Sequence, residues 1–369
     1  MTLRAGARPS VCVIGGGIAG CATAFFLARG GARVTLVERD TVGSHASGVN
    51  FGGVRRHARA AVELPLALRA HLLWPRLRGL IGHDCDLETP GHMKLAFSAR
   101  EMAELEAWAP LGHAHGLEVE LLDRSALARR LPVLGAEIHG ASLLAGDGFA
   151  NPRFVSPGLA RALRAMGGEV HEGFEVRALV QGPEGWTVEA GDGRCLRAEI
   201  VVCATGAWPG KALAALGEAT PLRAAAPQMF VTEPVANLHL PVLGIVSGAI
   251  YLRQSVRGNL IFGGGHGEIA PDGRRSCPGA AAFARTPALL ARLLPDVARV
   301  PVIRSWTGIE GHTPDGLPLI GPSPCHQGLF HARGFCGHGF QMGLGVGETL
   351  AELILTGRSA IDLSPCLPN

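Results

Sequence analysis

The sequence has little lysine, little tyrosine and no cluster of one charge. Lys94 and Lys211 are the only lysines in 369 residues, and Tyr251 is the single tyrosine. The 34 basic residues face 31 acidic ones, which gives a formal net charge of +3. Without a Lys/Arg run that could follow a phosphate backbone, nucleic-acid binding is not expected. Any mechanism that requires a lysine has two candidates at most.

Cysteine pairs and long apolar runs are also missing. The nine cysteines are odd in number and contain no Cys-x-x-Cys motif, which is typical of reduced thiols rather than of a disulfide framework or a metal site. The apolar run that starts at Val11 is broken by glycines from Gly15 onward, so neither a signal peptide nor a membrane span is expected. We therefore expect a soluble cytoplasmic protein without bound metal.

Glycine is abundant instead, with 52 residues, and near the N-terminus the glycines form a regular motif. The apolar runs 11–14 and 34–37 are typical of buried parallel strands, and a helical pattern over 22–29 connects them. Between the first strand and the helix stands the motif Gly15-x-Gly17-x-x-Gly20.

Each residue of this motif has a physical role in holding a dinucleotide. Gly15 allows a tight turn, Gly17 lets a pyrophosphate approach the helix N-terminus, and Gly20 lets helix and strand pack closely. Glu38 closes the second strand and can accept both hydroxyls of an adenosine ribose, which favours FAD or NAD over NADP. A tight turn between packed elements is the alternative, but it leaves Glu38 unexplained.

Two further segments carry glycine-rich turns after apolar strands. Strands are expected over 169–180 and 186–190, and the second is followed by a hairpin turn at 191–193. An apolar strand over 200–203 comes next and ends in Ala204-Thr205-Gly206. Near the C-terminus, Trp306-Thr307-Gly308-Ile309-Glu310 and Thr313-Pro314-Asp315-Gly316 precede a strand over 328–332. Gly334-Phe335-Cys336-Gly337-His338-Gly339-Phe340-Gln341-Met342-Gly343 follows, and then a helix from about Gly345 to Leu355 that Gly357 ends.

In their order, these segments resemble the D-amino-acid oxidase/glycine oxidase superfamily of FAD-dependent oxidoreductases. Within it, the chain is most similar to sarcosine oxidase β-subunits, dimethylglycine dehydrogenase-like proteins and D-hydroxyproline or opine dehydrogenase subunits. The resemblance covers nearly the whole chain and implies FAD, not NAD, as cofactor. It implies an α/β fold in which a Rossmann-like FAD-binding domain, with a parallel sheet and a β-meander, carries an inserted α+β substrate domain with an antiparallel sheet.

The division that follows assigns 1–58, 145–220 and 303–369 to the FAD-binding domain, and 59–144 and 221–302 to the substrate domain. In the latter we expect a strand pair over 84–89 and 92–97, a helix over 98–108 capped by Ser98 and Glu101, three strands and a helix near 287–294. The expected FAD contacts are Gly15, Gly17, Ile18, Ala19, Gly20, Glu38, Arg39, Ser44, His45, Ser47, Gly48, Asn50, Gly52, Gly53, Val176, Ala204, Thr205, Gly206, Trp208, Gly308, Gly337, His338, Gly339, Phe340 and Gln341.

The C-terminal glycines also have a physical interpretation of their own. A helix that begins near Gly345 has unpaired N–H groups and positive potential at its start, which would stabilise the anionic edge of reduced flavin. The alternative is a glycine-rich turn that packs a helix on a sheet. His45 stands at a place similar to the covalent flavin attachment site of dimethylglycine dehydrogenase-like relatives, and an ordinary loop histidine is the alternative.

Arginines are the candidate anchors for a substrate carboxylate. The resemblance implies that an arginine near Arg55 or Arg56 binds it, and a guanidinium fork suits a carboxylate bidentately. For either one the alternative is a surface arginine. Tyr251 and Arg253 share one strand face, so both face the flavin or both face away. His338 and Gln341 are expected to border the flavin ring.

The expected reaction is oxidation of the CH–NH bond of an amino acid or secondary amine by hydride transfer to flavin N5. D-amino acids, cyclic imino acids, sarcosine-like compounds and opines are candidate substrates. Gln341 stands where oxidase relatives carry a lysine, and both lysines lie elsewhere in the sequence. We therefore predict a dehydrogenase that passes electrons to a partner subunit, quinone or dye. An oxidase that uses oxygen, and a weakly catalytic flavoprotein subunit of a larger complex, are the alternatives.

Overall fold

The N-terminal strand–helix–strand unit begins a six-stranded sheet in the computed structural model, which describes residues 8–208, 210–218 and 222–368. β1 pairs in parallel with β2 on one side and with β12 on the other, and β23 and β8 extend the parallel part outward. β22 is antiparallel at one edge. The sheet order is β22-β23-β12-β1-β2-β8, with bounds Leu319–Pro322, Leu329–Arg333, Ile200–Cys203, Ser10–Ile14, Arg33–Val37 and Glu169–His171.

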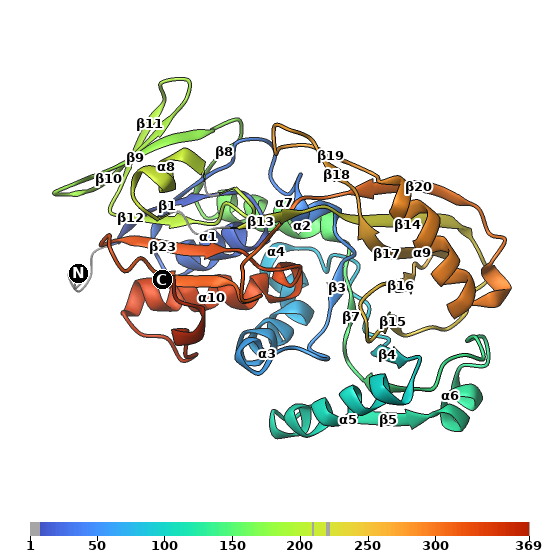
Figure 1. Ribbon diagram of the computed structural model, residues 1–369. Helices are drawn as coiled ribbons and strands as arrows, with labels where there is room; N and C mark the ends of the chain where they lie inside the picture. The colour runs from blue at the N-terminus through green and yellow to red at the C-terminus, as the bar shows by residue number, and fades with distance from the viewer. Residues whose placement is uncertain (1–7, 209, 219–221, 369) are drawn as a thin grey trace.

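The two faces of this sheet bury different partners. α1 (Ile18–Arg29), α7 (Pro152–Ala165) and α10 (Gly339–Thr356) cover one face in a shared hydrophobic core (Figure 1). The other face packs against a β-meander of β9 (Val176–Gly182), β10 (Gly185–Ala190) and β11 (Cys195–Ala198). Both faces are covered, so the central strands β1 and β12 are almost entirely apolar, as their sequences indicate. The predicted Rossmann-like sheet and meander are confirmed.

Strands from both expected substrate stretches form one eight-stranded sheet, shown on the right in Figure 1. Its pairs are antiparallel except for β15 with β4, which are parallel. The order is β20-β14-β17-β16-β15-β4-β6-β5, with bounds Val302–Thr307, Pro227–Pro234, Asn259–His266, Tyr251–Gln254, Val242–Ile245, His92–Ala96, Gly140–Leu144 and Val119–Asp123. One face of this sheet packs on α9 (Ala280–Leu293) and α6 (Arg124–Arg130) through a second hydrophobic core.

Three expected elements differ from the structure. The expected strand over 84–89 is wrong: this segment forms a turn with a single bridge from Glu88 to Phe149, and β4 pairs with β15 and β6 instead. α9 begins at Ala280 and carries Pro287 in its interior. α10 begins at Gly339, six residues before the expected start, because its glycines are helical rather than part of a loop.

The helix after Ser98 is confirmed and longer than expected. It is α5 (Ala99–Ala114), and Ser98 Oγ accepts a hydrogen bond from the Glu101 N–H at 3.2 Å. The Glu101 carboxylate reaches back to the Phe97 N–H at 2.6 Å, so the capping arrangement is reciprocal. The remaining short elements are α2 (Ala46–Val49), α3 (Leu64–Leu73), α4 (Leu77–Ile81), α8 (Gly210–Ala215), β3 (Gly53–Val54), β7 (Gly148–Phe149), β13 (Arg223–Ala225), β18 (Glu268–Ile269), β19 (Ser276–Cys277) and β21 (Glu310–His312).

α3 and α4 bear on the division into domains. Leu66, Ala70 and Leu77 are buried in the same core as α1 and α10, next to the six-stranded sheet. We therefore propose that the first boundary lies after residue 81 rather than at 59. The last boundary lies after β20, which belongs to the eight-stranded sheet, rather than at 303. In the described part of the chain, no helix is long and apolar enough to span a membrane.

Candidate active site

A cavity of about 690 Å³ runs between the two large sheets, and its size is that of a ligand site. One end is formed by the turn after β1 and the start of α1, and the other by β4, β16 and the segment after β3. Most of the expected contacts line it: Gly15, Gly17, Ile18, Ala19, Glu38, Arg39, Ser44, His45, Ser47, Asn50, Gly53, Val176, Ala204, Thr205, Gly206, Trp208, Gly308, Gly337, His338, Gly339, Phe340 and Gln341. Gly20, Gly48 and Gly52 do not, since they pack against backbone behind the wall.

The glycines of the first turn are required by backbone contacts. Gly15 has φ +110°, and a Cβ there would lie 2.3 Å from the Ala204 carbonyl oxygen. A Cβ on Gly20 would lie 2.0 Å from the Gly15 carbonyl oxygen. Real Cβ atoms are not found this close to other atoms, so β1, α1 and the turn after β12 can approach each other only with glycine at these positions. This close approach forms the first end of the cavity.

The start of α1 offers hydrogen-bond donors to this end. Gly17 is the N-cap and supplies no side chain, and the Ile18 N–H donates to Ser47 Oγ of α2 at 2.9 Å. The Gly16 N–H donates to the Glu38 carboxylate at 2.6 Å, and Glu38 is 8% exposed. N–H groups and the helix dipole at this point suit a pyrophosphate, with Glu38 placed for ribose hydroxyls.

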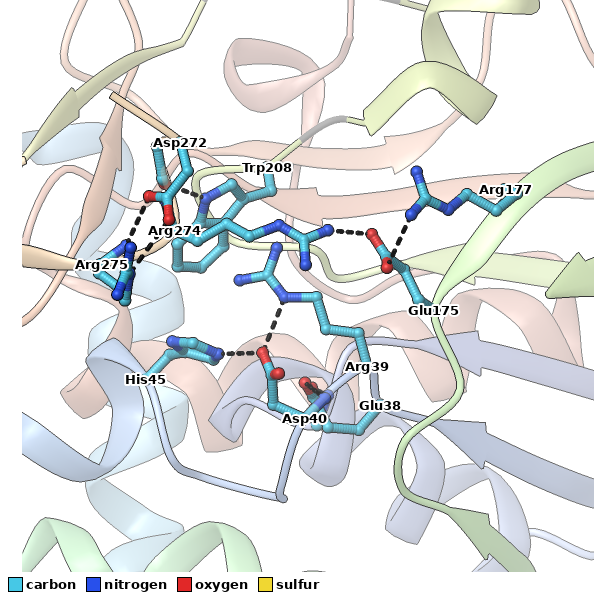
Figure 2. A network of polar contacts seen from close by, with 12 residues as sticks. Glu38, Arg39, Asp40, His45, Glu175, Arg177, Trp208, Asp272, Arg274 and Arg275 are labelled. Atoms are coloured by element: carbon cyan, nitrogen blue, oxygen red, sulfur yellow. Dashed lines mark hydrogen bonds and ion pairs between the residues drawn. The ribbon is translucent and has the colours of Figure 1, made fainter. Parts of the chain in front are cut away.

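A polar network closes the cavity beside Glu38 (Figure 2). The Arg39 guanidinium lies 4.2 Å over the Trp208 ring, and Arg39 Nε donates to Asp40 at 2.9 Å. Asp40 also bonds to His45 Nε2 at 2.7 Å. Trp208 Nε1 donates to the Gly273 carbonyl at 2.7 Å, and thereby ties the loop between β18 and β19 to the six-stranded sheet.

Unpartnered polar atoms in this wall fit a polar cofactor. Arg39 Nη2 and Thr205 Oγ1 are buried and have no hydrogen-bond partner among the described residues. Buried polar groups are nearly always satisfied, so such atoms point to a ligand that would supply the partner. Thr205 stands in the Ala-Thr-Gly turn, and Arg39 directly follows Glu38.

The other end of the cavity is lined by cationic side chains. Arg55 and Arg59 follow β3, and Lys94 comes from β4. Arg59 is 3% exposed, its Nε donates to the Arg55 carbonyl at 3.4 Å, and its Nη1 has no partner among the described residues. Burial and the charge of Arg55 lower the pKa of Arg59 to about 9. Burial and the charges of Arg55 and Arg59 lower the pKa of Lys94 to about 8.

A carboxylate and a histidine border these cations. Glu63 is 1% exposed and accepts a hydrogen bond from His338 Nδ1 at 2.7 Å. Burial and the charge of Arg59 lower the pKa of His338 to about 4, so this imidazole is neutral at pH 7. Burial alone would raise the pKa of Glu63, but the hydrogen bond from His338 and the nearby arginines outweigh it, and the pKa is lowered. Glu63 is therefore ionised.

Two further histidines support β4 without carrying charge. His57 Nδ1 donates to the His92 carbonyl at 3.0 Å, and His57 Nε2 accepts from Ser142 Oγ at 2.8 Å. Burial lowers the pKa of His57 to about 3, and burial and His57 lower that of His92 well below its ordinary value. His92 lines the cavity next to Lys94, and His57 lies behind it.

The expected substrate residues divide into two groups. Arg55, Tyr251, His338 and Gln341 line the cavity, whereas Arg56 and Arg253 do not. Arg56 turns away and forms an ion pair with Asp147 at 2.8 Å. Arg253 does share a strand with Tyr251, but its Nε donates to the Phe51 carbonyl at 3.0 Å and its guanidinium lies 4.3 Å from the Phe149 ring centroid. Gln341 Nε2 donates to the Ala67 carbonyl of α3 at 2.8 Å.

The glycines inside α10 have a packing role. A Cβ on Gly343 would lie 2.7 Å from Ile18 Cγ2, and one on Gly347 would lie 2.5 Å from Ala22 Cβ. Both therefore let α10 pack closely on α1. The expected helix start near Gly345 is thus wrong, and the end of α10 that lines the cavity is Gly339, with His338 as its N-cap.

No sequence motif pointed to four residues at this end of the cavity, which are Arg59, Glu63, His92 and Lys94. His92 and Lys94 alternate on a strand that was expected, so their shared face was available as a signal. Cys336 and His312 also line the cavity. Burial raises the pKa of Cys336, but hydrogen bonds from His312 and Thr313 outweigh it and lower the pKa, so this thiol is not simply a buried apolar side chain.

Fold and site together define a dinucleotide-binding oxidoreductase with a second sheet over the cavity. The family model of the FAD-dependent oxidoreductases, DAO, matches residues 10–353, and the chain belongs to this family. Its cofactor is FAD. Glycine oxidase of Geobacillus kaustophilus is 29% identical, with 97% of this chain and 96% of that protein covered. Sarcosine oxidase subunit beta of Rhizobium meliloti is 28% identical, with 94% and 84% covered.

Solved structures agree with this assignment. The crystal structure of the Geobacillus kaustophilus glycine oxidase matches with a TM-score of 0.88 at 27% identity, over 98% of each chain. That of L-proline dehydrogenase from P. horikoshii matches with a TM-score of 0.89 at 26% identity, over 98% of this chain and 97% of the other.

Proposed function

We propose that this protein oxidises the CH–NH bond of an amino acid or secondary amine that carries a carboxylate. The observation that carries the proposal is the pair of half-buried Arg55 and buried Arg59 in the cavity wall, with Arg59 Nη1 unpartnered among the described residues. A guanidinium in a dry pocket is the preferred partner of a carboxylate. Relatives named for glycine, sarcosine and proline support a substrate of this kind.

Each part of the cavity has a task in this reaction. FAD, when bound, would supply the two-electron oxidant for the bond between the amine and its neighbouring carbon. The arginines hold the carboxylate and so orient that carbon, and the eight-stranded sheet covers the substrate from water. The amine releases one proton to solvent, and water then hydrolyses the imine to a carbonyl compound and an amine. Burial and the nearby cations keep His338 and His92 neutral, so these two histidines add no further positive charge to the wall.

The electron acceptor is the finer part of the proposal. Gln341 favours a dehydrogenase, which would pass electrons to a partner subunit, quinone or dye. An oxidase is the second candidate, and Lys94 favours it. Both lysines were expected to lie away from the site, but Lys94 lines the cavity. The relatives named as glycine oxidases favour the same alternative. We propose a dehydrogenase that acts in the cytoplasm. Comparing turnover with a dye and with oxygen distinguishes it from an oxidase.

Anaerobic mixing of the purified holoprotein with a panel of amino acids and secondary amines tests the proposal. We expect at least one carboxylate-bearing amine to bleach the flavin absorbance, whereas the same amine as its methyl ester should not. If none of the panel bleaches the flavin, the weakly catalytic subunit is the better description. With the active amine, turnover with dye and with oxygen is then compared. Peroxide formation as fast as dye reduction would overturn the dehydrogenase.

A further inference from the structure

The charges at the substrate end of the cavity do not balance. Arg55, Arg59 and Lys94 contribute three cations to one wall. Of the carboxylates near them, Asp147 is 0% exposed and is committed to Arg56 Nε and to the N–H groups of Arg56 and His57. Asp147 and Arg56 therefore neutralise each other.

One acid remains to face the three cations. Glu63 is ionised and contacts neutral His338, so it offsets one positive charge. Glu104, whose charge also acts on Lys94, has a side chain that is 55% exposed and lies 3.8 Å from Arg100. Exposed carboxylates are screened by water and contribute little across a protein wall. Three cations and one acid leave two uncompensated positive charges at this end of the cavity.

Two uncompensated charges indicate a substrate with two negative ones. A charge taken out of water without a partner is costly, so a wall of this kind is stable only if a ligand or solvent supplies the counter-charges. A substrate with a single carboxylate satisfies the arginine pair alone. Lys94 stands on a different element from the arginines, and its neighbour on β15 is Gly244, which places no side chain beside it.

We propose that the preferred substrate is an amino acid or secondary amine that carries two carboxylates, with the first held by Arg55 and Arg59 and the second by Lys94. This proposal rests on the proposed function and adds a second carboxylate to the substrate. The chemistry at the carbon next to the amine is unchanged, because Lys94 binds the substrate and takes no part in the oxidation.

Matched substrate pairs test the second charge. Iminodiacetate and sarcosine differ by one carboxylate on the same secondary amine, and D-glutamate and D-glutamine differ by one charge at the same shape. In anaerobic bleaching of the holoprotein, we expect the dicarboxylate of at least one pair to have a ratio of rate to apparent Kd about tenfold higher or more. Equal ratios within both pairs would overturn the proposal while leaving the proposed function intact. No bleaching by any of these four compounds, when another carboxylate-bearing amine of the panel does bleach the flavin, would also overturn the proposal. No bleaching by the whole panel would contradict the proposed function itself.

A lysine variant and its matched control test the assignment to Lys94. Lys94→Met should raise the apparent Kd of the dicarboxylate about tenfold relative to that of its monocarboxylate partner. Lys211→Met, at the only other lysine, which is exposed on α8, should leave that ratio unchanged. A readout without turnover is the flavin absorbance change caused by diglycolate, a non-oxidisable dicarboxylate, compared with methoxyacetate. Unaltered diglycolate binding in Lys94→Met would overturn the role of this lysine.

Discussion

The two ends of the cavity are built in different ways. At the cofactor end, glycines let three backbone segments approach, and N–H groups at the start of α1 point to the site. At the substrate end, long charged side chains from separate elements meet, and we propose that the positive charge they leave unpaired selects the substrate. Where close backbone contacts form a site, an added Cβ atom disrupts the fold around it. Where side chains form a site, a substitution leaves the fold intact and changes the affinity for the ligand. The predictions below test this difference.

The largest effect is expected at the cofactor end. Gly15→Ala puts a Cβ at φ +110° within 2.3 Å of the Ala204 carbonyl oxygen, so β1 and β12 would have to move apart. We expect the variant to lose at least about 2 kcal/mol of stability and to purify without stoichiometric flavin. Flavin content per chain and the thermal midpoint measure this.

Gly31→Ala is the matched control, because Gly31 also has positive φ, at +94°, but its added Cβ meets nothing within 4 Å. It should cost backbone strain alone and keep its flavin. If both variants hold flavin equally, close backbone approach is not what forms this end of the cavity.

At the substrate end, we expect a loss of catalytic efficiency without loss of flavin. Arg55→Lys keeps the charge and removes the bidentate fork, and should lower kcat/KM about 100-fold for a carboxylate-bearing amine. Arg56→Lys changes the neighbouring residue, which pairs with Asp147 outside the cavity wall, and should lower kcat/KM by a few-fold at most. Equal losses in steady-state assays of the two variants would contradict the assignment of the clamp to Arg55.

The same contrast explains what the sequence could predict. The strand–turn–helix motif with Glu38 is local in sequence, and its glycines are dictated by backbone geometry, so the residues that line this end of the cavity could be predicted from the sequence. Arg59, Glu63 and Lys94 become a site only through long-range packing, and no local spacing marks them. The prediction of a strand over 84–89 was wrong for the same reason, because the strands that pair with β4 lie far away in the sequence, at 140–144 and 242–245.

Glycines in α10 show that glycine alone does not mark a ligand. Gly347→Ala puts a Cβ 2.5 Å from Ala22 Cβ, so we expect a loss of about 1–3 kcal/mol of stability with an unchanged flavin spectrum. Gly79→Ala in α4 is the control: its Cβ meets nothing within 4 Å, and it should stabilise by about 0.5–1 kcal/mol through helix propensity. Chemical denaturation measures both. A changed flavin spectrum in Gly347→Ala would instead indicate that this glycine contributes to the cofactor site.

The smallest effect is expected from pH at Lys94, where the pKa is lowered to about 8 by burial and by Arg55 and Arg59. Lys94 is a cation below that pH and neutral above it, so the preference for a dicarboxylate should decline as pH rises through 8. The substrate amine and Arg59, whose pKa is lowered to about 9, also titrate in this range. Both act on the part of the substrate that the two members of a matched pair share. The ratio of kcat/KM for D-glutamate to that for D-glutamine therefore isolates the lysine.

We expect this ratio to fall by up to about tenfold between pH 7 and 10 in the unmodified protein and to stay level in Lys94→Arg, whose guanidinium remains charged. His57 and His92, the titratable neighbours on the same side, are neutral throughout this range and cannot cause the change. The same slope in Lys94→Arg would assign the titration to another group, and the second carboxylate would then need a different partner from the one on β4.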